Sequence, residues 1–266
     1  MLTFILASGR TGTVFMESAL SEVSGVTSCH ERYGRLLRII EAMHASGVAN
    51  SLFQKIAKGL ICFPLYKYRN NDLIHIEVNN MIRSFIDIVF DCFPEATYIH
   101  IVRDPREHVR SGVNWTANKP IMKYLKLYFP YLGVHPEKFT LGQTQLDKIF
   151  EIVLMNWVRS NECYGSLASK AKNYHLLKFE DFVSAPALFM QKLLQLADYK
   201  NYDQEALVQA AVGKASQNRS EKCISSWREW EDKYINYISS RCTDLMSQYG
   251  YGNDKEWKDR VLKSSG

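Results

Sequence analysis

Short apolar runs alternate along the chain with longer segments whose apolar residues recur every three to four positions. The short runs are rich in branched and aromatic residues and predict buried strands over residues 2–6, 26–29, 72–78, 97–102 and 174–179. The longer segments have the period of amphipathic helices and cover residues 13–23, 35–63 with a break near Gly47, 82–93, 146–167, 188–196 and 226–249. Another helix is expected to begin at Pro105, because proline suits a first helical turn.

Strands that alternate with helices in this way predict an α/β fold. The same alternation implies a parallel sheet covered by helices on both faces, as three layers. The chain has 266 residues, of which 46% are hydrophobic, and no Pro/Gly/Ser-rich linker or internal repeat interrupts it. A single domain over residues 1–266 is therefore expected.

Charge and cysteine content narrow the possible ligands. The net charge of +5 arises from 33 basic and 28 acidic residues, spread along the chain. This mild excess suits an anionic ligand and not a nucleic acid, because no dense basic run is present. The six cysteines contain no CxxC pair, so reduced thiols and no metal site are expected. No apolar run approaches the ~18 residues of a membrane span, and no signal peptide is recognisable, which predicts a cytoplasmic protein.

The first predicted strand and helix are joined by a loop suited to an anion. Its sequence is Ala-Ser-Gly-Arg-Thr-Gly-Thr, residues 7–13. Backbone N–H groups of such a loop converge at a helix N-terminus, where the helix dipole adds positive charge. Gly9 and Gly12 permit a tight backbone, and Arg10 adds a fixed charge. The loop lacks the lysine of a Walker A motif, and an ordinary strand-to-helix turn remains an alternative.

A second basic site follows the predicted strand at residues 97–102. Arg103 comes directly after this strand, at the sheet edge where parallel α/β folds bind ligands. Ser111 follows eight residues later, about two turns along the helix that begins at Pro105. A guanidinium and a hydroxyl placed in this way can bind one phosphate together. The simpler alternative is that Arg103 forms an ion pair with Asp104 or another acid.

These two motifs resemble those of the sulfotransferases that use 3′-phosphoadenosine 5′-phosphosulfate (PAPS), whose fold is P-loop-like. Gly-Arg-Thr-Gly-Thr at 9–13 is similar to their phosphosulfate loop, and Arg-Asp-Pro at 103–105 with Ser111 is similar to their 3′-phosphate motif. Phe-Glu-Asp at 179–181 and the ending Gln-Tyr-Gly-Tyr at 248–251 also fit the family, and the small-molecule branch carries lysine where this chain has Arg10. The match is therefore closer to the carbohydrate and tyrosyl-protein branch.

The resemblance implies a set of donor-binding residues. The 5′-phosphosulfate would be held by Gly9, Arg10, Thr11, Gly12, Thr13 and Val14, although Val14 replaces the hydroxyl residue common at its position. The 3′-phosphate would be held by Arg103 and Ser111. Arg219 and Trp227 resemble the late loop that covers the nucleotide. PAPS would be the only cosubstrate, without a metal, and Arg10 would stabilise charge on the leaving group.

The resemblance also points to the residue that removes the acceptor's proton. In related enzymes this base is a glutamate just over twenty residues beyond the basic residue of the loop, and Glu31 lies 21 residues after Arg10. His30 is an alternative whose unperturbed pKa is closer to neutral pH. His75 and Glu77 are further alternatives, because the small-molecule branch uses a histidine upstream of the 3′-phosphate motif.

The acceptor itself is indicated only by chemical class. Residues 119–139 combine aromatic side chains with lysines and could contact a sugar, a phenol or an acidic group, or could simply fill the core. The expected reaction is sulfuryl transfer to a hydroxyl on a carbohydrate, a lipid, another small molecule or tyrosine. A P-loop kinase and a non-catalytic nucleotide-binding module are the alternatives.

Overall fold

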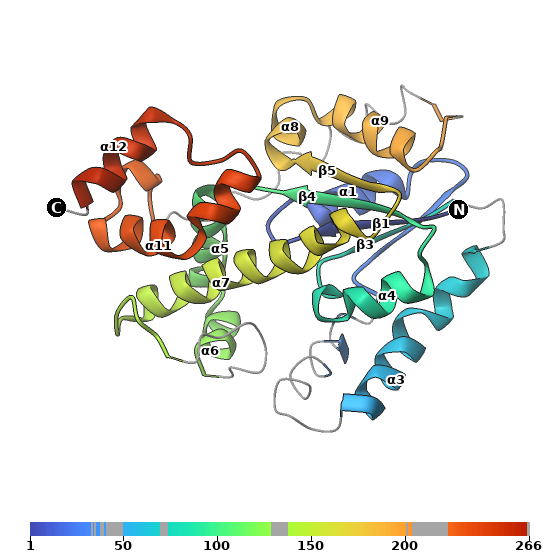
Figure 1. Ribbon diagram of the computed structural model, residues 1–266, viewed down its shortest axis with the longest axis horizontal. Coiled ribbons are helices and arrows are strands. Elements are labelled where there is room, and N and C mark those ends of the chain that lie inside the picture. Colours follow the sequence, from blue (N-terminus) through green and yellow to red (C-terminus); the bar gives the residue numbers. More distant parts are fainter. Residues whose placement is uncertain are drawn as a thin grey trace. The chain divides into compact units, whose positions relative to one another are not determined.

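The computed structural model describes the chain as two compact units (Figure 1). The first unit contains Met1–Val102 and Cys163–Asn218, and the second contains Arg103–Glu162 and Arg219–Gly266. All residues are described except 33, 35, 38–39, 41–49, 70–73, 129–137, 201, 204–222 and 265–266. The predicted helix break at Gly47 and residues 129–137 of the aromatic segment at 119–139 therefore lie outside the described residues. That the whole chain acts as a single domain stays a prediction.

A five-stranded parallel sheet forms the centre of the first unit, which confirms the predicted fold class. The strand order is β2-β3-β1-β4-β5, and all four strand pairs are parallel. The strands are β1 (Leu2–Ala7), β2 (Val26–His30), β3 (Ile74–Asn79), β4 (Thr97–Val102) and β5 (Tyr174–Lys178). Every residue of β1, β3 and β4 is buried, as expected for strands covered on both faces. Their carboxyl ends lie at one edge of the sheet.

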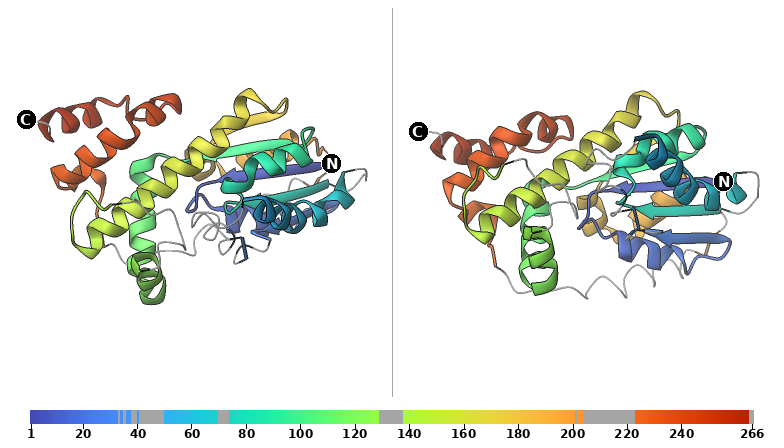
Figure 2. Two further views of the ribbon diagram at one scale, coloured as in Figure 1. Left: turned by 60° about the horizontal axis from the view of Figure 1, so that its bottom comes forward. Right: turned by 90° about the horizontal axis from the view of Figure 1, so that it is seen from below.

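Helices cover both faces of this sheet (Figure 2). Because side chains alternate along a strand, β1 contributes Leu2, Phe4 and Leu6 to one hydrophobic cluster and Ile5 and Ala7 to another. The helical elements of the first cluster include α3 (Asn50–Ile61), the 3₁₀ turns η1 (Phe63–Tyr68), η2 (Arg83–Phe85) and η4 (Ser166–Ser169), α4 (Ile86–Cys92) and the end of α7 (Gln145–Gly165). Those of the second are α1 (Thr13–Leu20), α8 (Phe179–Ser184) and α9 (Pro186–Leu196). The three predicted layers are confirmed.

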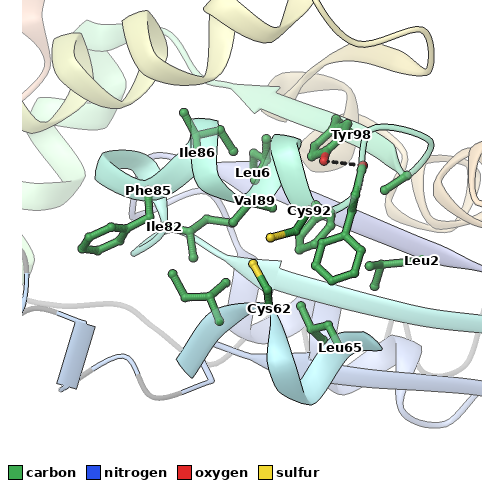
Figure 3. Close-up of a cluster of buried hydrophobic side chains, with 14 of the residues drawn as sticks. Leu2, Leu6, Cys62, Leu65, Ile82, Phe85, Ile86, Val89, Cys92 and Tyr98 are labelled. Atoms are coloured by element: carbon green, nitrogen blue, oxygen red, sulfur yellow. Dashed lines mark hydrogen bonds between the residues drawn. The ribbon is translucent and has the colours of Figure 1, made fainter. Parts of the chain in front are cut away.

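The cluster beneath α3 and α4 is drawn in Figure 3. Phe4 stacks on Tyr98 with ring centroids 5.4 Å apart. The buried Tyr98 hydroxyl donates to the backbone oxygen of Phe93 at 2.8 Å, which satisfies a polar group that would otherwise destabilise the core. Burial raises the pKa of the Tyr98 hydroxyl above its ordinary value.

The second unit is helical in the residues described. It contains α5 (Pro105–Ala117), α6 (Pro120–Tyr128), the part of α7 (Gln145–Gly165) up to Glu162, η5 (Trp227–Glu229), α11 (Asp232–Gln248) and α12 (Lys255–Ser264). Phe150 on α7 packs against Trp230 at 5.2 Å and Tyr234 at 4.6 Å between ring centroids. None of the helices in the described residues has the length and apolar content needed to cross a bilayer.

Candidate functional site

The loop between β1 and α1 adopts an unusual backbone conformation. Arg10 has φ of 71° and Gly12 has φ of 70°, both in the left-handed region that side chains with a Cβ rarely occupy. The Thr11 hydroxyl donates to the backbone oxygen of Ser8 at 2.8 Å and fixes the turn from inside. The loop opens directly into α1, where Gly12 is the N-cap residue. The first N–H groups of a helix have no partner within the helix itself, and such groups can bind an anion.

Gly12 is required by packing as well as by its backbone angle. A Cβ at this position would lie 3.1 Å from Phe179 and 3.3 Å from Phe182, closer than most real Cβ contacts. Both rings belong to α8, which begins with the Phe-Glu-Asp segment predicted at residues 179–181. Helix α8 therefore packs against the loop at Gly12. Val14, on the first turn of α1, is 65% exposed.

Arg10 is partly buried in this loop. Burial lowers the pKa of its guanidinium, but arginine remains charged at neutral pH. A partly desolvated charge interacts more strongly with a bound anion than a charge in water does. The loop can thus combine backbone donors with one fixed positive charge.

The predicted His-Glu pair lies beside the start of α1. Nε2 of His30, the last residue of β2, shares a hydrogen bond with the Thr13 hydroxyl at 3.1 Å. The same nitrogen lies 3.9 Å from Oε1 of Glu31. Glu31 is itself held by a hydrogen bond from its backbone N–H to the oxygen of Val78 at 3.0 Å. The structure therefore brings the loop at residues 7–13 together with His30 and Glu31.

Glu31 shares the backbone feature of Arg10. Among the described residues, only three non-glycine residues have positive φ, namely Arg10 at 71°, Glu31 at 47° and Asp198 at 54°. Such conformations cost about 1–3 kcal/mol each and persist at functional sites because the surrounding structure holds them. Two of the three are the residues expected to carry the chemistry.

The other candidate bases belong to a buried polar row along β3. His75 is 1% exposed, stacks on Tyr68 with centroids 4.0 Å apart, and pairs in register with Leu2 at the start of β1. It therefore lies far from the edge where the loop begins. Glu77 is 2% exposed and contacts His75 at 3.3 Å and Arg32 at 3.6 Å. These contacts favour a structural role for both residues.

In the second unit, the predicted 3′-phosphate motif forms the start of α5. Asp104 is the N-cap, and its carboxylate accepts from the backbone N–H of Arg106 at 2.9 Å. Pro105 occupies the first turn, as the sequence predicted. The backbone oxygen of Arg103 accepts from the indole of Trp157 at 2.8 Å. Ser111 lies partly exposed on the same helix.

Of the two residues predicted to lie in the loop that covers the nucleotide, Arg219 lies outside the described residues. Trp227 is 4% exposed and packs against Arg106 and Trp257. Asn114, which the sequence analysis did not single out, binds the backbone just after residue 222: its side-chain oxygen accepts from the N–H groups of Cys223 at 2.6 Å and Ile224 at 2.8 Å.

The sequence matches no family model and no curated protein. Solved structures do match. Sulfotransferase STF9 from Mycobacterium avium is 11% identical, with 94% of this chain and 76% of that chain covered and a TM-score of 0.56. Mouse sulfotransferase SULT7A1, solved in complex with PAP, is 10% identical, with 98% and 88% covered and a TM-score of 0.53. The chain therefore has the fold of these sulfotransferases.

Proposed function

We propose that this protein is a sulfotransferase that moves a sulfuryl group from PAPS to an acceptor hydroxyl. The observation that carries the proposal is the conformation of Arg10 and Glu31, two non-glycine residues held with positive φ at the carboxyl edge of one sheet. The hydrogen bond between Thr13 and His30 connects their two segments. Strain of this kind is expected where positioning of a side chain matters more than stability. The shared fold supports the same reaction class.

The donor would be held by the two predicted motifs. Loop amides, with Gly9, Thr11, Gly12 and Thr13, would bind the 5′-phosphosulfate, and Arg103 and Ser111 would bind the 3′-phosphate. The motifs follow β1 and β4, which are neighbouring parallel strands, so the chain leaves both strands at one edge of the sheet. This arrangement agrees with ligand binding at the carboxyl ends of strands in α/β folds.

The chemical step is an in-line displacement at sulfur. The acceptor oxygen forms a bond to sulfur while the bond from sulfur to the bridging oxygen breaks, which gives a sulfate ester and adenosine 3′,5′-bisphosphate. Arg10 would neutralise the charge that grows on the bridging oxygen, an effect worth ~3–4 kcal/mol for comparable groups. Glu31 would accept the acceptor's proton. His30, fixed by Thr13, would orient Glu31 or replace it as the base.

Ligand binding tests the donor assignment. We expect adenosine 3′,5′-bisphosphate at 100 times its dissociation constant to add ~2.7 kcal/mol of apparent stability, measured as a rise in melting temperature. Adenosine 5′-monophosphate should have much less effect, because it lacks the 3′-phosphate. Equal shifts from the two nucleotides would contradict the roles of Arg103 and Ser111, and a large shift with ATP and magnesium would favour a kinase.

A variant of Glu31 tests the chemistry separately. Glu31→Gln should retain binding of adenosine 3′,5′-bisphosphate, because the base does not contact the donor's phosphates. Its turnover with PAPS and an acceptor panel should fall by roughly 10²–10⁴-fold, as for loss of a general base. His30→Gln is the matched comparison. If Glu31→Gln kept full turnover while His30→Gln lost it, the base would be His30.

A further inference from the structure

Arg106 is a buried arginine in the second unit that the proposed reaction does not use. It is 6% exposed and lies on the first turn of α5, three residues after Arg103. Its Nε donates to Oδ1 of Asp104 at 3.0 Å and its Nη2 donates to Oδ2 at 2.6 Å. Its Nη1 donates to Oδ2 of Asp254 at 2.9 Å. Both sides of the guanidinium fork are therefore occupied by carboxylates, the geometry that arginine favours.

Two indole rings complete the surroundings of this guanidinium. Its central carbon lies 4.6 Å from the ring centroid of Trp227 and 5.1 Å from that of Trp257, within the range of cation–π contacts. The two indoles contact each other edge to face at 5.5 Å. Burial alone would lower the pKa of Arg106, but its hydrogen bonds to Asp104 and Asp254 raise it. A buried charge needs such complete pairing to be tolerated.

The carboxylate of Asp104 connects this cluster to the predicted phosphate motif. One of its oxygens also caps α5 by accepting from the Arg106 N–H, so the side chain and backbone of Arg106 hold the same carboxylate. Asp104 directly follows Arg103, whose backbone oxygen is fixed by Trp157. The turn that presents Arg103 is thus held on both sides, by Trp157 and by the Arg106 cluster.

The cluster also reaches the C-terminal end of the chain. Asp254 precedes α12 and accepts from the backbone N–H of Trp257 at 2.9 Å, so it caps that helix while it binds Arg106. Trp227, Asp254 and Trp257 are more than 100 residues from Arg103 in the sequence, yet they surround the side chain that holds the neighbouring Asp104. Packing by η5 and α12 therefore bears directly on the Arg103 turn.

We propose that Arg106 is a positioning residue of the donor site, through which Trp227, Asp254 and Trp257 set the geometry of Arg103 and α5 for the 3′-phosphate. This inference rests on the proposed function. It assigns Trp227 an indirect role: the indole supports Arg106 and need not touch the nucleotide. The ligand concerned is the 3′-phosphate of an adenosine nucleotide, and loss of the cluster should weaken recognition of that group selectively.

The ratio of two affinities tests this role. Adenosine 3′,5′-bisphosphate and adenosine 5′-monophosphate differ only in the 3′-phosphate, so the ratio of their dissociation constants, measured by calorimetry, reports that contact alone. Arg106→Lys keeps the charge and loses the planar fork, and we expect it to reduce the preference for the bisphosphate by about tenfold or more, as loss of a charge-assisted bond does. Turnover at saturating PAPS should stay near the wild-type value.

Arg260→Lys is the matched control. Arg260 lies on α12, the helix that contributes Trp257 to the cluster, but it binds Asp232 at 3.0 Å and the backbone oxygen of Trp230. The control should lower the melting temperature without changing the affinity ratio. If Arg106→Lys does not fold, Asp254→Asn serves instead, because it weakens one partner of Arg106 and leaves Asp104 in place; a reduced ratio is again expected.

The outcomes separate this inference from the function on which it rests. A wild-type protein that does not prefer the bisphosphate would overturn the 3′-phosphate assignment and the inference together. A wild-type preference that persists in the folded Arg106→Lys or Asp254→Asn protein would overturn the inference alone. So would an equal loss of preference in Arg260→Lys, because the effect would then reflect general stability of α12.

Discussion

At the scale of single residues, the candidate site is distinguished by the strained backbone conformation of two residues. Arg10 and Glu31 both adopt positive φ, and both carry a Cβ that disfavours this region. Arg10 was predicted from its place in the loop and Glu31 from the resemblance to the sulfotransferases. Their backbone angles depend on contacts made elsewhere, such as the packing of Phe179 against Gly12. A turn with only a structural role would avoid this cost in conformational free energy by using glycine.

Replacing Arg10 separates its backbone effect from its chemical effect. Because glycine tolerates positive φ, Arg10→Gly should be more stable than Arg10→Ala by about 1 kcal/mol in the free energy of unfolding. Both variants should lose turnover. Asp198 is the matched control, since it has φ of 54° at the end of α9: Asp198→Gly and Asp198→Ala should show the same stability difference with normal turnover. Full activity in either Arg10 variant would remove Arg10 from the mechanism.

At the scale of elements, the hydrophobic pattern located the strands and most helices. Errors occurred where local contacts override periodicity. Phe179 begins α8 and does not end β5, the predicted helix at residues 82–93 opens with the 3₁₀ turn η2, and α11 begins at Asp232, after η5. Helix α12 was not predicted, although Asp254, which caps it, is a recognisable start signal.

Helix α5 depends on a close contact that sequence pattern alone does not reveal. A Cβ at Gly112 would lie 2.5 Å from Cγ1 of Val153 on α7. Gly112→Ala should therefore overpack this interface and lower the free energy of unfolding by about 1–3 kcal/mol, measured by urea titration. Gly59 on α3 is the control, because nothing lies within 4 Å of a Cβ there. Gly59→Ala should raise stability by about 0.5–1 kcal/mol, and a similar gain in Gly112→Ala would show that α5 can move away from α7.

At the scale of the whole molecule, composition and strand–helix alternation were sufficient to predict the α/β class and the parallel sheet. The same information could not predict which distant residues enclose Arg106, because such pairing is set by three-dimensional packing and not by any local period. It also could not predict that the described residues form two compact units. All five tryptophans, at 115, 157, 227, 230 and 257, lie in the second unit, so tryptophan emission reports on that unit.

Acid should weaken the second unit through Asp147. This carboxylate is 2% exposed and accepts from the Tyr234 hydroxyl at 2.8 Å and from Lys233 at 2.9 Å. Burial alone would raise its pKa, but hydrogen bonds from Thr144, Lys233 and Tyr234 lower it. A lowered pKa in the folded state means that the stabilisation is present above the unfolded pKa, about 3.9, and is lost as pH falls through the folded value.

Tryptophan-monitored urea unfolding at pH 7, 5, 4 and 3 would measure this loss. Asp147→Asn should be less stable than the wild type at pH 7, because an amide cannot form the ion pair with Lys233. The difference between the two proteins should shrink below about pH 4, as the wild-type carboxylate becomes protonated. Asp87→Asn is the control: Asp87 pairs with Lys170 on the surface, where both side chains are exposed, and such pairs contribute little. A stability difference between wild type and Asp147→Asn that stayed constant from pH 7 to pH 3 would show that Asp147 acts through packing and not through its charge.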